Sequence, residues 1–324
     1  MNFVTLLTIL VIIFTALNMA KRDPPTTITG SAKAQELNKL GQRAMDGIAL
    51  SRIAHLIIPF KKQSRMWIVK VPIKPLEGEY APVESDVELP ELLVYSFETL
   101  TRVKDQGDCG SCWAFALADT VIDRKQQSRL HDLSVQYMLE CQNPNGCNGG
   151  HPEDAALFFL NQKRAIPKDS EMPYVQSNGG VPMQLCSDWN YATITRVVSI
   201  TKFTIDTPDV LAQNIRNMKL ELNTNGPFYA AMEVYDDFRD YDGLEPYAPR
   251  PGAELIGGHA VEIVGYVDND KRFKKPYWVC KNSWGNKWPV KSELKGFFMI
   301  ESGRNVCLIE SMCGYADASL ALVK

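Results

Sequence analysis

The stretch from Gln106 to Ile122 constrains this chain most, because it places a cysteine at the start of a buried helix. Apolar residues recur at helical spacing after Cys112, at positions 114, 117, 118, 121 and 122, which predicts an amphipathic helix packed into a core. Ser111 is the expected N-cap. Cys112 then lies on the first turn, where free backbone N–H groups and the helix dipole favour an anion. We therefore expect a lowered thiol pKa and a nucleophilic thiolate.

Gln106 lies six residues before Cys112, with two glycines between them. The turn that these glycines permit can bring the Gln106 amide back beside the sulfur, where it would donate to an oxyanion. Peptide cleavage by a thiol also needs an imidazole to carry the proton and a group that orients the imidazole. The downstream candidates are His259, in a Gly-Gly-His-Ala-Val run, and Asn282, in a Lys-Asn-Ser-Trp-Gly run.

The run from Cys109 to Trp113, Cys-Gly-Ser-Cys-Trp, resembles the active-site signature of the papain family of cysteine peptidases, which places its histidine about 130–150 residues downstream. His259 is 147 residues beyond Cys112, and Asn282 is 170 residues beyond it. The resemblance implies that Cys112 is the nucleophile, that His259 carries the proton and that Asn282 orients His259. It also implies that Gln106 and the Cys112 backbone N–H are the oxyanion donors. It implies no cofactor and no metal.

By the same resemblance, seven residues around these four would bind substrate: Gly110, Gly149, Gly150, His151, Gly258, Trp284 and Met312. Trp284 would also shield the hydrogen bond of the catalytic histidine from water. Met312, the fifth residue after Cys307, would form the floor of the P2 pocket, and a methionine there favours an apolar P2 side chain. Alternatively, Met312 is a core residue, and His151 and Pro152 decide the P2 preference.

The chain has eight cysteines, which is typical of an oxidising compartment. The papain-like resemblance implies two disulfides, Cys109–Cys147 and Cys141–Cys186. Apart from the nucleophile, three cysteines remain: Cys280, Cys307 and Cys313. Cys280 lies in an apolar segment and is expected to be a buried free thiol. The alternative is a zinc site built on the Cys-x-x-Cys pair, which is disfavoured because the spacing to the other cysteines matches no compact ligand cluster.

The first 88 residues differ from the rest of the chain. Residues 1–20 hold an apolar run without charged side chains, whose length suits a secretory signal peptide better than a membrane-spanning helix. An uncleaved anchor is the alternative, because the first charges follow the run. Residues 21–88 carry eleven basic and eight acidic side chains, and their position implies a propeptide that inhibits the enzyme until acid weakens its ion pairs. Residues 89–324 would be the peptidase domain of a secreted or endolysosomal protein.

The order of expected elements predicts an α+β, papain-like fold with two lobes. Helices are expected at 112–122, 134–139 and 152–163. Strands are expected at 192–200, 228–234, 261–267, 277–280 and 297–300, with one helix at 209–222. This order gives a mainly helical lobe, about 89–190, and a β-barrel-like lobe, about 191–324. The active site would lie in the cleft between the lobes.

Two further segments, 226–238 and 296–311, resemble the cathepsin B branch of the family. The occluding loop of that branch, with its pair of histidines, is missing between Cys147 and Tyr174. We therefore expect a cleft open at both ends, and an endopeptidase that acts on polypeptide substrates. The other expected partners of this monomer are its own propeptide and cystatin-like inhibitors, and the net charge of −3 gives no reason to expect nucleic acid. The alternatives are a catalytically silent binding or inhibitory relative, and an exopeptidase of the same family.

Overall fold

The computed structural model describes residues 79–80, 87–125, 131–142, 145–176, 189–289 and 291–321. All of these residues belong to one compact unit of the chain, Ser64–Lys324. The expected signal peptide, residues 1–20, lies outside the described residues, and so does nearly all of the expected propeptide, residues 21–88. Cys186 is outside them as well.

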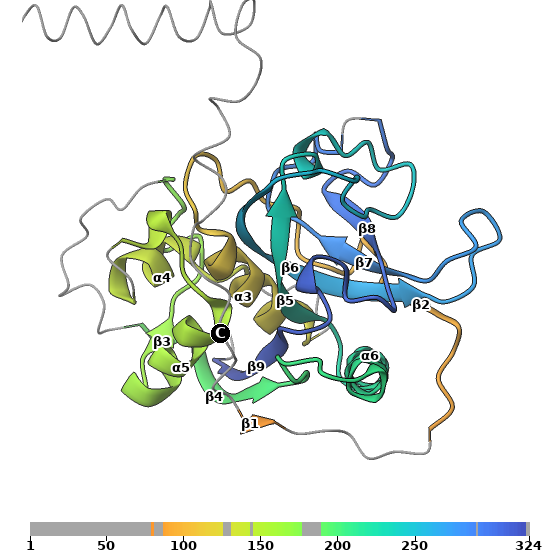
Figure 1. The fold of residues 1–324 in the computed structure, drawn as a ribbon. Coiled ribbons are helices and arrows are strands. Elements are labelled where there is room, and N and C mark those ends of the chain that lie inside the picture. The colour runs from red at the N-terminus through yellow and green to blue at the C-terminus, as the bar shows by residue number, and fades with distance from the viewer. Residues whose placement is uncertain are drawn as a thin grey trace, which may run out of the picture. The chain divides into compact units, whose positions relative to one another are not determined.

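Three helices lie together on one side of this unit (Figure 1). Helix α3, Cys112–Asp123, is buried at every position and fills the centre of an apolar core. Helix α4, Val135–Cys141, begins after Ser134, whose hydroxyl accepts a hydrogen bond from the Tyr137 N–H at 3.0 Å. Helix α5, Pro152–Gln162, has its proline at the first position, where no backbone N–H is needed. The predicted cap of α4 and the predicted start of α5 are confirmed.

The strands form a single mixed sheet in the order β1-β4-β9-β5-β6-β7-β8, with β2 pairing β6 and β3 pairing β4. Their bounds are β1 Glu79–Tyr80, β2 Leu92–Val94, β3 Ala165–Ile166, β4 Ala192–Ser199, β5 Phe228–Tyr235, β6 Leu255–Val267, β7 Tyr277–Lys281, β8 Phe297–Glu301 and β9 Cys313–Leu320. Helix α6, Pro208–Thr224, connects β4 to β5. All five predicted strand segments and the predicted helix at 209–222 are confirmed. The strand β6 begins six residues earlier than expected, and β1, β2, β3 and β9 were not foreseen.

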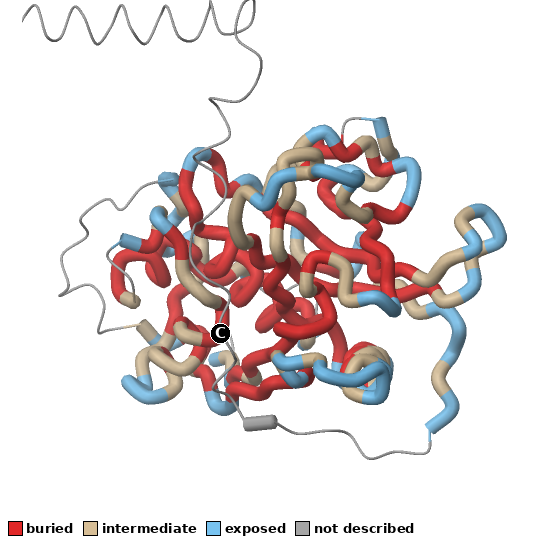
Figure 2. Tube along the Cα trace, in the orientation of Figure 1, coloured by how far each residue is buried: buried red, intermediate tan, exposed pale blue. Residues whose placement is uncertain are grey.

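Two large apolar cores lie in this part of the chain. One surrounds α3 and also contains buried residues of α4 and α5. The other lies among β5, β6, β7 and β8 and takes in the buried side of α6. In Figure 2 the buried segments of α3 and of the central strands lie next to one another. The α+β architecture with a helical and a β lobe is therefore confirmed, and α3 lies where the two cores meet.

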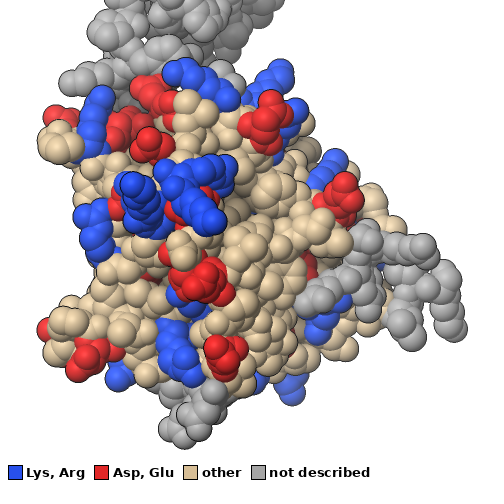
Figure 3. All heavy atoms as spheres, turned by 90° about the vertical axis from the view of Figure 1, so that its right-hand side faces the viewer, with Lys and Arg blue, Asp and Glu red and all other residues tan. Residues whose placement is uncertain are grey.

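The surface carries charges of both signs. On the face shown in Figure 3, basic and acidic side chains are interspersed. The β6–β7 hairpin, for example, holds an exposed pair between Arg272 and Asp270 at 2.6 Å. Such exposed pairs contribute little to stability. No helix in the described ranges combines the length and the hydropathy that crossing a bilayer requires.

Gly265 gives a test of the close approach between β2 and β6. A Cβ atom there would lie 2.7 Å from the Leu93 carbonyl oxygen and 2.8 Å from Val94 Cα, so backbone would have to move. We expect Gly265→Ala to lower the free energy of unfolding in urea by about 1–3 kcal/mol. Leu255→Ala, on the same strand at a side chain that is 54% exposed, should change it by less than about 0.5 kcal/mol. Equal effects of the two substitutions would contradict the packing described here.

Candidate active site

Cys112 is the first residue of α3 and is only 3% exposed. The backbone N–H of Ala260, the residue that follows His259 on β6, acts to lower the pKa of the thiol. The helical thiol therefore lies close to the strand that carries the histidine. Ser111 occupies the N-cap position but makes no capping hydrogen bond, contrary to expectation. Its hydroxyl instead lies 2.7 Å from the Tyr174 hydroxyl.

His259 is held by one of its two ring nitrogens. Its Nε2 lies 2.8 Å from Asn282 Oδ1, and the same oxygen accepts from the Ser283 N–H at 2.8 Å. An amide oxygen can only accept, so Nε2 carries the proton and Nδ1 is the basic nitrogen. Nδ1 is buried and has no hydrogen-bond partner among the described residues. The Trp284 ring lies 5.0 Å from the imidazole and covers it.

Gln106 is completely buried, and both ends of its amide are fixed. Its Oε1 accepts from the Ser283 hydroxyl at 2.7 Å, and its Nε2 donates to the Cys109 carbonyl oxygen at 3.0 Å. One N–H of Nε2 remains for another acceptor. The Tyr174 hydroxyl donates to the Gln106 carbonyl oxygen at 2.6 Å. The sequence pattern did not assign roles to Ser283 and Tyr174, and the only signal for Ser283 was its place between Asn282 and Trp284.

The family model for papain family cysteine proteases matches residues 94–317. The chain belongs to the papain family. It is 32% identical over 244 residues to "Cathepsin B-like cysteine proteinase 5" of Caenorhabditis elegans, which covers 65% of this chain and 68% of that protein. It is 30% identical over 238 residues to "Pro-cathepsin H" of Medicago truncatula, and this match covers 71% of this chain and 62% of that protein. Its fold is similar to that of the solved "proCathepsin B S9 from Trypanosoma congolense", with a TM-score of 0.62 and 23% identity over 81% of this chain and 89% of that one. The predicted papain-like fold and the likeness to cathepsin B are thereby confirmed.

The residues expected to bind substrate fall into two groups in this papain-family chain. Gly110, Gly149, Gly150 and His151 lie near the start of α3. Gly150 packs so closely on the Trp113 indole that a Cβ would lie 2.8 Å from its ring. The Gly110 N–H donates to the Cys147 carbonyl oxygen at 2.8 Å, and His151 is the N-cap residue of α5.

The second group lies around β6. Gly258 precedes His259 and pairs with Glu233 of β5. Met312 is 2% exposed, and its carbonyl oxygen accepts from the Ala231 N–H of β5 at 2.9 Å. The strand β5 therefore runs between Met312 and the histidine strand.

The cysteines divide into bonded and free groups. Cys109 and Cys147 form a disulfide that ties the segment before α3 to the short helix η2, Gly146–Asn148. These two sulfurs are bonded to each other and are therefore not metal ligands. Cys141 is also in a disulfide, and its expected partner Cys186 lies outside the described residues. The described cysteines with free thiols, all buried, are Cys112, Cys280, Cys307 and Cys313.

Burial opposes charge on both members of the thiol–imidazole pair. It raises the pKa of Cys112 to about 11, although backbone N–H groups, that of Ala260 first, lower it in part. It lowers the pKa of His259 to about 4, against the hydrogen bond to Asn282, which raises it. The expected lowering of the thiol pKa is therefore wrong for this form of the protein. The N-terminal end of a helix stabilises an anion less than loss of water destabilises one.

The buried histidine predicts a specific loss of stability in acid. Between pH 6.5 and about 4 the unfolded chain binds a proton at His259 that the folded chain excludes. The contribution of the neutral imidazole to the free energy of unfolding is therefore fully present above pH 6.5 and is lost as the pH falls toward 4. This group alone should contribute about 3 kcal/mol to that loss. We expect His259→Gln to lose less free energy of unfolding than the unmodified protein between these pH values, as measured by urea titration. Parallel pH profiles would contradict a neutral buried imidazole.

Proposed function

We propose that this papain-family protein is a thiol endopeptidase that hydrolyses peptide bonds through an acyl-enzyme on Cys112. The observation that carries the proposal is the state of His259. Its Nε2 is fixed by Asn282, while its basic Nδ1 is buried with no hydrogen-bond partner among the described residues, and the neighbouring Ala260 N–H favours the thiolate of Cys112. A nitrogen placed in this way is ready to accept the thiol proton.

In the proposed reaction, the Cys112 proton moves to His259 Nδ1 as the sulfur attacks the substrate carbonyl carbon. The transfer creates a thiolate and an imidazolium together, so their mutual attraction offsets the loss of water that disfavours each charge alone. The oxyanion accepts from the Cys112 N–H and from the remaining N–H of Gln106 Nε2. Collapse breaks the C–N bond, and His259 returns the proton to the leaving amine. Water then hydrolyses the thioester, with His259 as its base.

A catalytically silent relative is the main alternative, and one pair of measurements separates the two. We expect an epoxide that alkylates active-site thiols to label one site per molecule, and Cys112→Ala to abolish both labelling and peptide hydrolysis. Gln106→Ala should lower the hydrolysis rate by roughly 100- to 1,000-fold, because the oxyanion loses a donor, yet keep epoxide labelling, which forms no carbonyl oxyanion. Gln213→Ala, on α6, is the matched control. Full hydrolysis by folded Gln106→Ala would remove Gln106 from the mechanism.

Endopeptidase rather than exopeptidase action is supported by the segment from Cys147 to Tyr174. Within it, η2 leads directly through His151 into α5, and His151 is its single histidine. The segment therefore offers no histidine pair to bind a substrate C-terminus. The backbone of Gly149 and Gly150 would instead pair with an extended chain passing through.

The P2 preference follows from Met312, whose buried thioether would leave an arginine unpaired. We expect Leu, Val or Phe at P2 to exceed Arg in kcat/KM by about 10-fold in a positional-scanning library, which is about 1.4 kcal/mol. Met312→Glu should narrow that difference. Preference for Arg in the unmodified protein, or release of C-terminal dipeptides as the main activity, would overturn the assignment.

We further propose that the protein is made as a zymogen. Residues 1–20 would be a signal peptide, residues 21–88 an inhibitory propeptide, and residues 89–324 the peptidase domain. The similarity to a relative named "Pro-cathepsin H" supports this order. The product would be a monomer in the secretory or endolysosomal pathway, open to cystatin-like inhibitors.

A further inference from the structure

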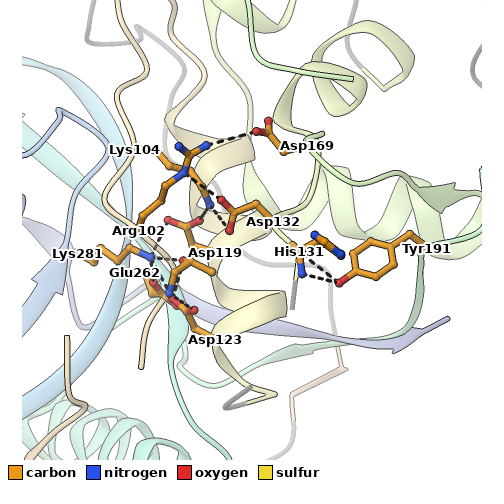
Figure 4. Close-up of polar contacts among 11 residues, drawn as sticks. Arg102, Lys104, Asp119, Asp123, His131, Asp132, Asp169, Tyr191, Glu262 and Lys281 are labelled. Atoms are coloured by element: carbon orange, nitrogen blue, oxygen red, sulfur yellow. Dashed lines mark hydrogen bonds and ion pairs between the residues drawn. The ribbon is translucent and has the colours of Figure 1, made fainter. Parts of the chain in front are cut away.

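A network of buried charges lies behind the proposed catalytic residues, with Lys281 at its centre (Figure 4). The Lys281 side chain is 1% exposed. Its Nζ lies 3.0 Å from Asp119 Oδ2, 3.0 Å from Asp123 Oδ2 and 3.4 Å from Glu262 Oε2. It also donates to the Thr101 hydroxyl. Lysine is almost never buried to this degree unless it is paired, and here three carboxyl groups surround it.

Lys104 is the second cation of the network. Its side chain is 9% exposed, forms an ion pair with Asp119 and lies 3.5 Å from Asp132 Oδ1. Asp119 thus bridges two lysines, which hold its pKa below the ordinary value although burial opposes its charge. Glu262 behaves differently, because burial raises its pKa well above the ordinary value and the neighbouring aspartates add to the effect. Charge is therefore disfavoured on the Glu262 carboxyl group, although Lys281 beside it acts in the opposite direction.

Two of the catalytic segments contribute the acidic members. Asp119 and Asp123 follow Cys112 on α3 by seven and eleven residues, which is about two and three turns, so all three lie on one face of the helix. Glu262 follows His259 by three residues on β6. The nucleophile and the proton carrier are therefore on the same elements as the carboxyl groups that meet at Lys281.

The other two catalytic segments contribute the lysines. Lys281 is the last residue of β7 and directly precedes Asn282, and Lys104 lies two residues before Gln106. Backbone hydrogen bonds join these two segments, since the Gln106 N–H donates to the Ser283 carbonyl oxygen at 2.8 Å. The pairing of β6 with β7, in which Glu262 lies opposite Lys281, joins them to the histidine strand as well.

Helix α3 differs from these three segments in how it can be attached. Its backbone groups are used within the helix, so along most of its length it meets the strands through side chains alone. Apolar contacts hold it against the sheet but are non-directional. Ion pairs with fixed partners specify one position along the helix axis and one rotation about it, which is the best-attested use of buried polar groups.

We propose that the network of Lys281 and Lys104 with Asp119, Asp123 and Glu262 positions α3, and with it the Cys112 thiol, against the strands that carry His259 and Asn282. These are positioning residues for the reaction proposed above, and the inference rests on that proposed function. A displacement of the thiol by even about 1 Å is enough to cost roughly 100-fold in rate.

The test removes one charge of each sign. In Lys281→Met with Asp123→Asn, methionine keeps the length of the lysine stem, and the asparagine oxygen still accepts from the Thr101 N–H, which lies 2.6 Å from Asp123 Oδ1. Asp119 keeps Lys104. We expect this variant to fold, with kcat for a peptide reduced about 10-fold or more and KM changed by less than about 3-fold. Alkylation of Cys112 by iodoacetamide, which needs no substrate site, should slow by a similar factor.

A second double variant, Lys104→Met with Asp132→Asn, removes the other lysine of the network together with Asp132, the partly exposed carboxylate that lies 3.5 Å from it. Because Lys104 holds Asp119 of α3 and also lies two residues before Gln106, kcat should fall, and iodoacetamide alkylation should slow by a smaller factor than in the first variant. The matched control is Lys219→Met with Asp268→Asn, which removes a 2.6 Å ion pair between α6 and the end of β6 and should change neither rate.

The outcomes separate positioning from stability alone. Unchanged kcat and unchanged alkylation in either folded network variant, with only a lower Tm, would overturn the inference. An equal loss in the control variant would overturn it as well. If the unmodified protein hydrolyses no peptide, the proposed function fails, and the alkylation rates of the first double variant and its control still decide whether the network positions the thiol.

Discussion

The pairing of β6 with its neighbours is the constraint on which the site depends. In an antiparallel sheet a slip of one residue would turn every side chain to the opposite face, so the register of β6 fixes which groups meet. With the register observed, His259 lies opposite Met232 of β5, and Glu262 lies opposite Lys281 of β7. The residue after Lys281 is then Asn282, whose side chain reaches the imidazole.

Nearly every polar group at the site is buried, and this has two physical effects. Hydrogen bonds in such surroundings are strong. They hold the side-chain amides of Asn282 and Gln106 and the hydroxyl of Ser283 in one arrangement. Isolated charges, in contrast, are disfavoured, so the thiol and imidazole rest as neutral groups. The geometry of such a site is set before the reaction begins, and its two charges are created only as a pair during the reaction.

Local signals in the sequence were sufficient for much of the fold. The apolar spacing after Cys112 predicted α3, and Ser134 and Pro152 predicted the starts of α4 and α5. The strand β9 was missed because Cys313–Leu320 contains small and polar residues without clear alternation, and its pairing with β4 and β5 decides its conformation. Tertiary context of this kind overrides weak local preference.

The candidate residues were also found from short motifs, but their environment was not. Sequence gives no measure of the solvent lost at Cys112, so the sign of its pKa shift was predicted wrongly. The ion network was missed for a related reason. Lysine is normally exposed, and Lys281 lies 162 residues along the chain from Asp119, so only the folded structure brings them together.

The buried cysteines have a consequence for the chemical reactivity of the protein as a whole. Cys280 and Cys313 are fully buried, Cys307 is 7% exposed, and burial raises the pKa of all three thiols. Among the described free thiols, Cys112 is the one whose thiolate is favoured by the backbone N–H of Ala260, the residue next to His259. Among the described thiols, a reagent therefore has one target in the folded protein, and three more become accessible when the described domain unfolds. Reactive thiols counted per molecule would thus report, in one sample, both the fraction of working sites and the fraction of unfolded chains.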